Sequence, residues 1–129
     1  MKSLKGLRKD ARQVFSLYTR TKENGVCFTC GVKKDPKEMD CGHFIHRDAL
    51  DFNEMGNHCQ CVHCNHYLHG NLGVYAVLMV KKYGLKRVEE LQRLASVPRK
   101  FTREELEKIL NKYTAKLVKL LKVKNEYSL

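Results

Sequence analysis

Two Cys-x-x-Cys pairs constrain this chain more than any other feature of its sequence. They are Cys27-Phe-Thr-Cys30 and Cys61-Val-His-Cys64, with thirty residues between them. A two-residue spacing lets both sulfurs of a pair reach one ion, and two pairs complete a tetrahedral set of thiolates. The spacing therefore predicts a structural zinc site with Cys27, Cys30, Cys61 and Cys64 as ligands and no open position for water. Metal binding would supply folding free energy to a segment that is poor in apolar residues.

Two further cysteines, Cys41 and Cys59, lie outside these pairs. We interpret them as small buried residues or incidental thiols. The alternative is that Cys59, two residues before Cys61, replaces one of the ligands. The N-terminus has no apolar secretory segment, so six cysteines favour metal binding over disulfides. We therefore expect a soluble, cytoplasmic protein.

The length and the missing motifs narrow the class of protein. A chain of 129 residues supports one domain with a modest core. It contains neither the glycine-rich dinucleotide fingerprint nor a phosphate-binding P-loop. The longest apolar stretch, Val74 to Val80, is far too short to span a bilayer, so we expect no membrane partner.

The charge of the chain lies mainly at its two ends. The formal net charge is +11, of which residues 1–25 and residues 99–129 carry +5 each. Residues 26–98 carry only +1 and contain every Cys and His. Basic segments can neutralise phosphates and release counterions, which favours nucleic-acid binding over a merely solvated lysine-rich surface.

Apolar periodicity predicts helices on both sides of an irregular centre. We expect a helix over about residues 3–21, ended by Asn24-Gly25, and turns with short strands over 26–64. Helical spacing returns after Cys64, and Thr102-Arg-Glu-Glu105 forms a capping box before a long amphipathic helix. The apolar stripe of that helix indicates packing on the domain, with a dimer interface as the alternative.

The insert between the cysteine pairs contains residue types that suit phosphodiester hydrolysis. His43 lies in the insert, and Asn65 directly follows the last cysteine. This is the arrangement expected of a ββα-metal (His-Me) nuclease, in which a hairpin presents the His and the next helix presents the Asn. A neutral imidazole can take a proton from water, and Mg²⁺ or Mn²⁺ held by oxygen ligands can neutralise charge on the phosphate.

These patterns predict one α+β, mostly helical domain with three parts. Residues 1–25 would form a basic N-terminal helix, and residues 26–72 a zinc-stapled ββα-metal core. Residues 73–129 would form two to three C-terminal helices.

Several runs of residues occur in a specific order. They are Asp40-Cys-Gly-His43-Phe-Ile-His-Arg, Phe52-Asn-Glu, His58-Cys-Gln-Cys61-Val-His-Cys64-Asn65, Gly70-Asn71, Lys81-Lys-Tyr83-Gly84 and Phe101-Thr102-Arg-Glu-Glu105. In order and spacing, over about residues 26–118, they resemble the phage NinG/Rap family of recombination proteins. That family is understood as structure-specific endonucleases acting on Holliday junctions and D-loops. The layout is also similar to the phage resolvase endonuclease VII, in which His is the base and the Asn after the last Cys binds the metal.

The resemblance implies that His43 is the general base and that Asn65 is a ligand of the catalytic metal. The resolvase has an acidic ligand immediately before the His, whereas this chain has Gly42. On a strand, Asp40 would point to the same side as position 42, roughly 7 Å away from it. Asp40 is therefore the candidate replacement for the acidic ligand. Family members often carry an Asn at the position of Gly56, so the role of the adjacent Asn57 stays open.

Other polar residues have weaker assignments. His58 matches a His of the family pattern, and a structural hydrogen bond and a site role are equally open. His69 lies one helical turn after Asn65 and is a candidate contact for the ion or a phosphate, with a surface role as the alternative. His46, His63 and His66 are interpreted as surface residues or neighbours of the site. Arg47, Lys81 and Lys82 are candidate phosphate contacts, with ordinary solvation as the alternative.

The predicted function is a metal-dependent endonuclease that hydrolyses branched recombination intermediates. One alternative is a non-catalytic zinc module that binds DNA or a recombination partner, which Gly42 supports. Another is an HNH nuclease that acts on linear duplex. The implied partners are branched DNA, host or phage recombination proteins, and a second copy of the chain, because a four-way junction has two-fold symmetry. If a phage encodes the chain, the host cytoplasm is the expected location.

Overall fold

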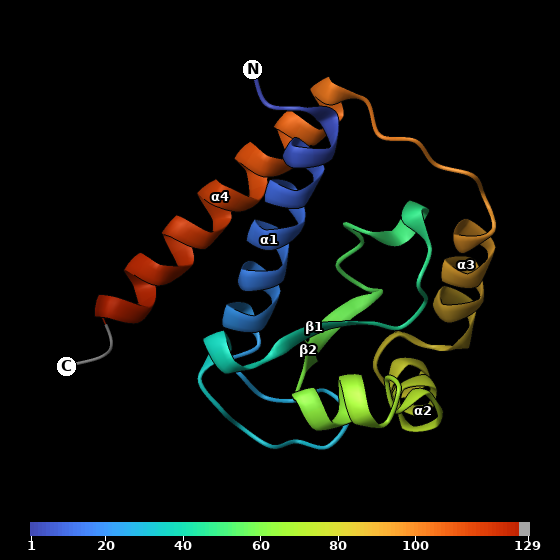
Figure 1. Cartoon of the computed structure of the whole chain (residues 1–129). Coiled ribbons are helices and arrows are strands. Elements are labelled where there is room, and N and C mark those ends of the chain that lie inside the picture. The colour runs from blue at the N-terminus through green and yellow to red at the C-terminus, as the bar shows by residue number, and fades with distance from the viewer. Residues whose placement is uncertain (127–129) are drawn as a thin grey trace.

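The computed structural model describes residues 1–126 and has a mostly helical α+β fold with a two-stranded sheet (Figure 1). In chain order the elements are α1 (Leu4–Lys22), the 3₁₀ turn η1 (Pro36–Glu38), β1 (Asp40–His43), the 3₁₀ turn η2 (Asp48–Leu50), β2 (Asn57–Gln60), the π-helical turn η3 (His63–Tyr67), α2 (Leu72–Tyr83), α3 (Leu85–Ala95) and α4 (Arg103–Glu126). The predicted C-terminal part includes residues 127–129, which lie outside the described residues. Within residues 1–126, no helix combines the length and apolarity needed to cross a membrane.

The helix predicted near the N-terminus is confirmed as α1. Its N-cap residue Ser3 accepts a hydrogen bond from the backbone N–H of Gly6 at 3.0 Å, which satisfies one of the free donors of the first turn. The helix ends where Asn24 and Gly25 adopt φ values of 57° and 68°. This left-handed backbone, which glycine and asparagine tolerate best, turns the chain toward the first cysteine pair.

The long helix α4 packs along α1 (Figure 1). The ring of Tyr113 on α4 meets the ring of Phe15 on α1 edge-on, with centroids 4.8 Å apart, and lies 5.3 Å from Tyr18. The predicted capping box is present, because the Glu105 backbone N–H donates to Thr102 and the Glu105 carboxylate accepts from the Thr102 backbone N–H. Because Tyr113 packs against the rings of α1, the expected packing of the apolar side of α4 on the domain is confirmed.

A second apolar cluster holds α2 and α3 against the turn η2. Its buried members are Leu50, Tyr75, Met79, Val88 and Leu91. The hydroxyl of Tyr75 donates to the backbone oxygen of Gly42 at 2.8 Å, so this cluster also anchors β1. The hairpin thus lies between two packed groups of helices.

The strands β1 and β2 pair antiparallel, with His43 opposite Asn57 and Gly42 opposite His58. Side chains alternate along a strand, so His43 and Cys41 belong to one face of β1, and Asp40 belongs to the other. Cys41 packs with the aromatic cluster of α1 and α4. The face that carries His43 is therefore the α1 side of the sheet.

The chain after the second cysteine pair does not form one continuous helix, although helical spacing returns there in the sequence. The π-helical turn η3 ends at Tyr67, and His69, Gly70 and Asn71 all have positive φ before α2 begins at Leu72. His69 is consequently not one helical turn beyond Asn65, as the sequence suggested. The break was hidden because the apolar residues on both sides keep a helical spacing.

Glu54 connects the hairpin loop to both long helices. Its carboxylate accepts hydrogen bonds from the Tyr113 hydroxyl at 2.9 Å and from the ammonium groups of Lys22 and Lys116, each at 3.2 Å. Burial alone would raise the pKa of the Glu54 carboxyl, but these three donors outweigh burial and hold the pKa below its ordinary value of 4.5.

We predict that Glu54→Gln lowers the free energy of unfolding at pH 7 by about 1 kcal/mol, because the charge-assisted hydrogen bonds are lost at a partly exposed site. A carboxyl whose pKa is depressed in the folded state stabilises the protein above its unfolded pKa, and this contribution disappears as pH falls through the folded pKa. Urea unfolding at several pH values from 7 down to about 3 measures the effect.

The difference in the free energy of unfolding between Glu54→Gln and the parent should therefore shrink as the pH falls. The exposed Glu89→Gln on α3 is the matched control and should change stability little at any pH. A difference that stays constant with pH would contradict the assigned role of the Glu54 charge.

Candidate functional site

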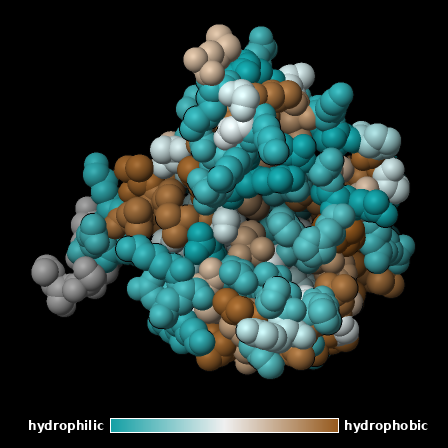
Figure 2. Space-filling model, viewed as in Figure 1, coloured by the Kyte–Doolittle hydropathy of each residue, from teal (hydrophilic) through white to brown (hydrophobic). Residues whose placement is uncertain are grey.

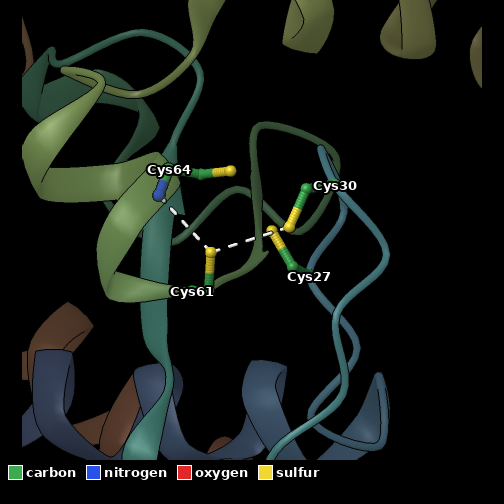
Figure 3. Close-up of side chains that lie close together, drawn as sticks. All are labelled: Cys27, Cys30, Cys61 and Cys64. Atoms are coloured by element: carbon green, nitrogen blue, oxygen red, sulfur yellow. Dashed lines mark hydrogen bonds between the residues drawn. The ribbon is translucent and has the colours of Figure 1, made fainter.

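The four cysteines of the two predicted pairs come together in space. The sulfur atoms of Cys27, Cys30, Cys61 and Cys64 all lie within 4.8 Å of one another, and they turn toward a common centre (Figure 3). The sulfurs of Cys30 and Cys61 are 3.7 Å apart. Zinc–sulfur bonds of about 2.3 Å in a tetrahedron require sulfurs close to this separation. The cluster therefore fits a metal ion such as zinc.

Hydrogen bonds around Cys27 favour the thiolate that a metal requires. The Gln60 side-chain amide donates to the Thr29 hydroxyl oxygen at 3.0 Å, which leaves the Thr29 hydroxyl proton free to point at the Cys27 sulfur, 3.4 Å away. Burial raises the pKa of Cys27, but the Thr29 hydroxyl and nearby backbone N–H groups lower it to about 6. A pKa in this range makes deprotonation at neutral pH easy.

Cys41 and Cys59 are not part of the cluster. They face each other across the hairpin ladder, on the side of α1. Burial raises the pKa of each thiol to about 12, so both stay protonated at neutral pH. The alternative in which Cys59 replaces a ligand is not needed, because Cys61 completes the set.

The imidazole of His43 is held by Asn57, its partner across the hairpin. The Asn57 amide nitrogen donates to the backbone oxygens of Leu50 at 2.9 Å and Asn53 at 2.7 Å, which uses both of its protons. The Asn57 side-chain oxygen is therefore the atom that contacts His43 Nδ1, and it must accept a proton from that nitrogen. This fixes the neutral tautomer of His43, with its lone pair on Nε2.

His43 opens onto a cleft of about 310 Å³ beside α1. The other residues lining this cleft are Arg12, His46, Arg47, Asp48 and Asp51. Burial lowers the pKa of His43 below its ordinary value, and the hydrogen bond to Asn57 offsets this only in part. No described residue forms a hydrogen bond with Nε2. The ring is thus neutral at pH 7, with a free acceptor nitrogen.

Asp40 and Asn65 meet on the other face of β1. The Asn65 side-chain nitrogen lies 3.1 Å from a carboxylate oxygen of Asp40. The Asn65 amide nitrogen donates to Asp40 here, and the Asn65 oxygen would have to turn toward the carboxylate for both residues to offer the oxygen ligands that hard divalent cations prefer. The sequence expected His43 and Asn65 around one site, but the alternation of side chains along β1 places His43 and Asp40 on opposite faces.

Gly42 has a structural explanation. A Cβ atom at this position would lie 1.8 Å from the side-chain oxygen of Gln60, which is fully buried. The Gln60 oxygen has no conventional hydrogen-bond partner among the described residues, and it lies against the Cα of Gly42. An acidic side chain at position 42 is excluded while Gln60 bridges Thr29 and the backbone oxygen of Gly70.

A second cleft lies beside η3. It is lined by His46, Asn65, His66, Tyr67 and His69. His69 therefore shares a cleft with Asn65, although not through helical spacing. The ring of His46 lies 5.1 Å from that of His43, and His46 lines both clefts. His46 is thus the residue that connects the two halves of the candidate site.

His58 is placed for a structural role. Only 1% of this residue is exposed, and its ring stacks on Phe28 with centroids 4.2 Å apart. Nδ1 lies 2.8 Å from the Glu23 carboxylate, and Nε2 contacts the Met55 backbone oxygen and the Tyr83 hydroxyl. Both ring nitrogens are occupied, so no lone pair or proton remains for a substrate.

The three predicted phosphate contacts fall in different places. Arg47 lines the His43 cleft. Lys81 and Lys82 lie in the last turn of α2, and the Lys82 ammonium sits over the rings of Phe28 and Tyr83 at 5.8 and 5.6 Å. Of the three, only Arg47 is beside the candidate base.

Sequence reasoning missed three residues of this site. The role of Asn57 depends on the hairpin register, and Arg12 reaches His43 from a helix some thirty residues earlier. His46 was interpreted as a surface residue or a neighbour of the site, and its spacing of three from His43 was the one available indication that both could share a loop at the end of a strand.

The fold and the cysteine cluster define a small, mostly helical α+β protein with a candidate metal centre. A family model described as the bacteriophage lambda NinG protein matches residues 1–125, and the chain belongs to the NinG family. The chain is 32% identical over 122 residues to the NinG protein of Escherichia phage lambda, and 31% identical over 122 residues to that of Salmonella phage P22. No solved structure matches the chain.

Each of these alignments covers 92% of this chain and 59% of the relative. The chain thus spans about three fifths of the length of the curated relatives it matches.

We predict one tightly bound zinc per chain, measurable by elemental analysis of the purified protein. Structural zinc contributes on the order of 10 kcal/mol to folding, which is comparable with the whole stability of a typical domain. Cys30→Ser should therefore lose the metal and unfold the hairpin region, as seen in amide exchange.

Cys41→Ser is the matched control, since it also removes a thiol from the same region but lies outside the cluster. It should keep the full zinc content. Equal zinc loss in both variants, or none in Cys30→Ser, would contradict the assigned ligand set.

Proposed function

We propose that this protein is a metal-dependent endonuclease that hydrolyses phosphodiester bonds in branched DNA such as Holliday junctions and D-loops. The proposal follows from the family resemblance and from the chemistry of the His43 cleft. The proposal includes a ββα-metal core, which would consist of the hairpin β1–β2 and the turn η3 that follows it. The single observation that carries the proposal is the contact between His43 Nδ1 and the side-chain oxygen of Asn57, which leaves Nε2 as the acceptor nitrogen.

A general base must present a lone pair to water and must be uncharged at working pH. Asn57 holds the proton of His43 on Nδ1, which leaves Nε2 as the acceptor. Burial keeps the ring neutral by lowering its pKa. Arg12 and Arg47 line the same cleft together with the carboxylates of Asp48 and Asp51. Asp51 pairs with Nε and Nη2 of Arg12, so Arg47 and Nη1 of Arg12 are the cationic groups that would contact a phosphate.

In the proposed step, Nε2 of His43 takes a proton from a water molecule as the water oxygen forms a bond to phosphorus. The bond from phosphorus to the leaving sugar oxygen breaks, and that oxygen takes a proton from solvent. The guanidinium groups of Arg12 and Arg47 would stabilise the negative charge that grows on the phosphate oxygens.

Asp40 and Asn65 are the residues that would hold Mg²⁺ or Mn²⁺. Such a cation is commonly bound by one or two carboxylates together with water and substrate phosphates, so two protein ligands are sufficient. When bound, it would supply positive charge to a DNA phosphate on the Asn65 side of β1. His46 and His69 line the cleft on the Asn65 side, and they would contact the DNA there.

We predict that His43→Ala lowers the rate of nicking of a labelled four-way junction by ~10²–10⁴-fold, because the general base is removed. The measurement is a single-turnover assay with Mg²⁺ or Mn²⁺, alongside a D-loop and a linear duplex. Zinc content and melting temperature should stay at the parent values.

His63→Ala is the matched control, because His63 is an exposed histidine on η3 that lines neither cleft of the candidate site. It should nick at nearly the parent rate. Binding of the junction without any nicking by the parent protein would favour a non-catalytic zinc module, and equal cutting of linear duplex would favour an HNH nuclease of another type.

We also predict the pH dependence of nicking. The base works when deprotonated, so the rate should be flat at neutral pH and should fall as pH drops through the pKa of His43. Because burial lowers that pKa, the midpoint of the acid limb should lie below 6.5, the ordinary value for imidazole. A midpoint above 6.5 in the single-turnover rate would contradict the assignment of His43 as the base.

A further inference from the structure

A groove of about 590 Å³ runs along the exposed side of α1. Five of the seven residues that line it are cationic: Lys5, Arg8, Lys9, Arg12 and Arg20. The other two are polar and uncharged, and no acidic side chain lines the groove within the described part of the chain. Side chains at spacings of three and four along a helix share one face, so Lys5, Arg8, Lys9 and Arg12 form a continuous stripe, and uncharged residues separate them from Arg20.

The cations of the groove are of three kinds, one of which is Arg20, held by backbone oxygens outside α1. Asp51 holds Arg8 at 2.7 Å and Arg12 at 2.6 Å, so these two guanidinium groups are fixed in place. By contrast, neither Lys5 nor Lys9 forms an ion pair with any residue in the range 1–126. These two lysines leave uncompensated positive charge at one end of the groove.

The groove leads directly to the candidate base. Arg12 lines both the groove and the His43 cleft. It uses Nε and Nη2 to contact Asp51, which leaves Nη1 available for another acceptor. An anionic chain lying in the groove would therefore pass from the lysines to Arg12 and then reach His43.

We infer that this α1 groove binds the phosphate backbone of one DNA strand and guides it to the His43 cleft. The inference rests on the proposed nuclease function and names the surface that this function uses. It also selects the N-terminal of the two basic segments of the sequence, because α4 lines neither the His43 cleft nor the cleft beside η3.

An anionic membrane is a poor fit for this groove. A basic helix that binds a membrane inserts its apolar face between the lipids. The apolar face of α1, which contains Leu7, Ala11 and Phe15, is buried in the fold. Hydrophilic side chains dominate the molecular surface over α1, whereas a hydrophobic patch lies over α4 at the left (Figure 2).

The test compares two double variants that each remove two positive charges. Lys5→Gln/Lys9→Gln changes the groove, and Lys86→Gln/Arg87→Gln changes an exposed basic pair on α3, which lies across the molecule from α1 (Figure 1). Binding of a labelled four-way junction is measured at several salt concentrations, with zinc-loaded protein and no added Mg²⁺ or Mn²⁺. Each phosphate contact contributes about 0.9 to the slope of log affinity against log salt.

The groove variant should bind several-fold more weakly at low salt, and its slope should fall by about 2. The α3 variant should keep the parent slope. Equal losses in both variants, or an unchanged slope in the groove variant, would overturn the inference.

The binding and nicking measurements distinguish failure of the nuclease proposal from failure of the groove inference. If the parent protein binds DNA through the groove but never nicks it with metal present, the nuclease proposal is contradicted and the groove inference stands. If nicking depends on His43 but the groove variant binds DNA as the parent does, only the groove inference is contradicted.

Discussion

The hairpin β1–β2 depends on the cysteine cluster, because four residues per strand make a ladder too short to be stable alone. One cysteine pair precedes β1 and the other follows β2, so a metal ion among their sulfurs would join the chain on both sides of the hairpin. Gln60 adds a second link, because its amide joins Thr29 of the first pair to Gly70 beyond η3. The positions of His43 and Asp40 follow from this frame.

The alternation of side chains along β1 divides the candidate chemistry into two halves. One face presents His43 to α1, where arginines and Asn57 surround it. The other face presents Asp40 to Asn65 beside η3. Gly42 lies between them without a side chain, because Gln60 occupies that space. His46 lines the clefts on both sides, and DNA bound over this residue would contact both halves.

Local patterns in the sequence predicted the features that depend on local chemistry. Ligand spacing predicted the cysteine cluster, and apolar periodicity with a capping box predicted α1 and α4. The features that depend on long-range packing were not predictable in this way. The register that pairs His43 with Asn57, the reach of Arg12 to the cleft and the interruption of the helix at His69 all arise from how distant segments meet. The buried environment of His58 likewise depends on Glu23 and Tyr83, which lie far from it in the chain.

The most direct test of this account is the protonation state of the His43 ring, measured by ¹⁵N NMR of the zinc-loaded full chain at pH 7. The account predicts a neutral ring with its proton on Nδ1, where Asn57 accepts it, and a bare Nε2 facing the cleft. A ring with its proton on Nε2, or a charged ring at pH 7, would contradict the claim that the hairpin prepares His43 as a general base.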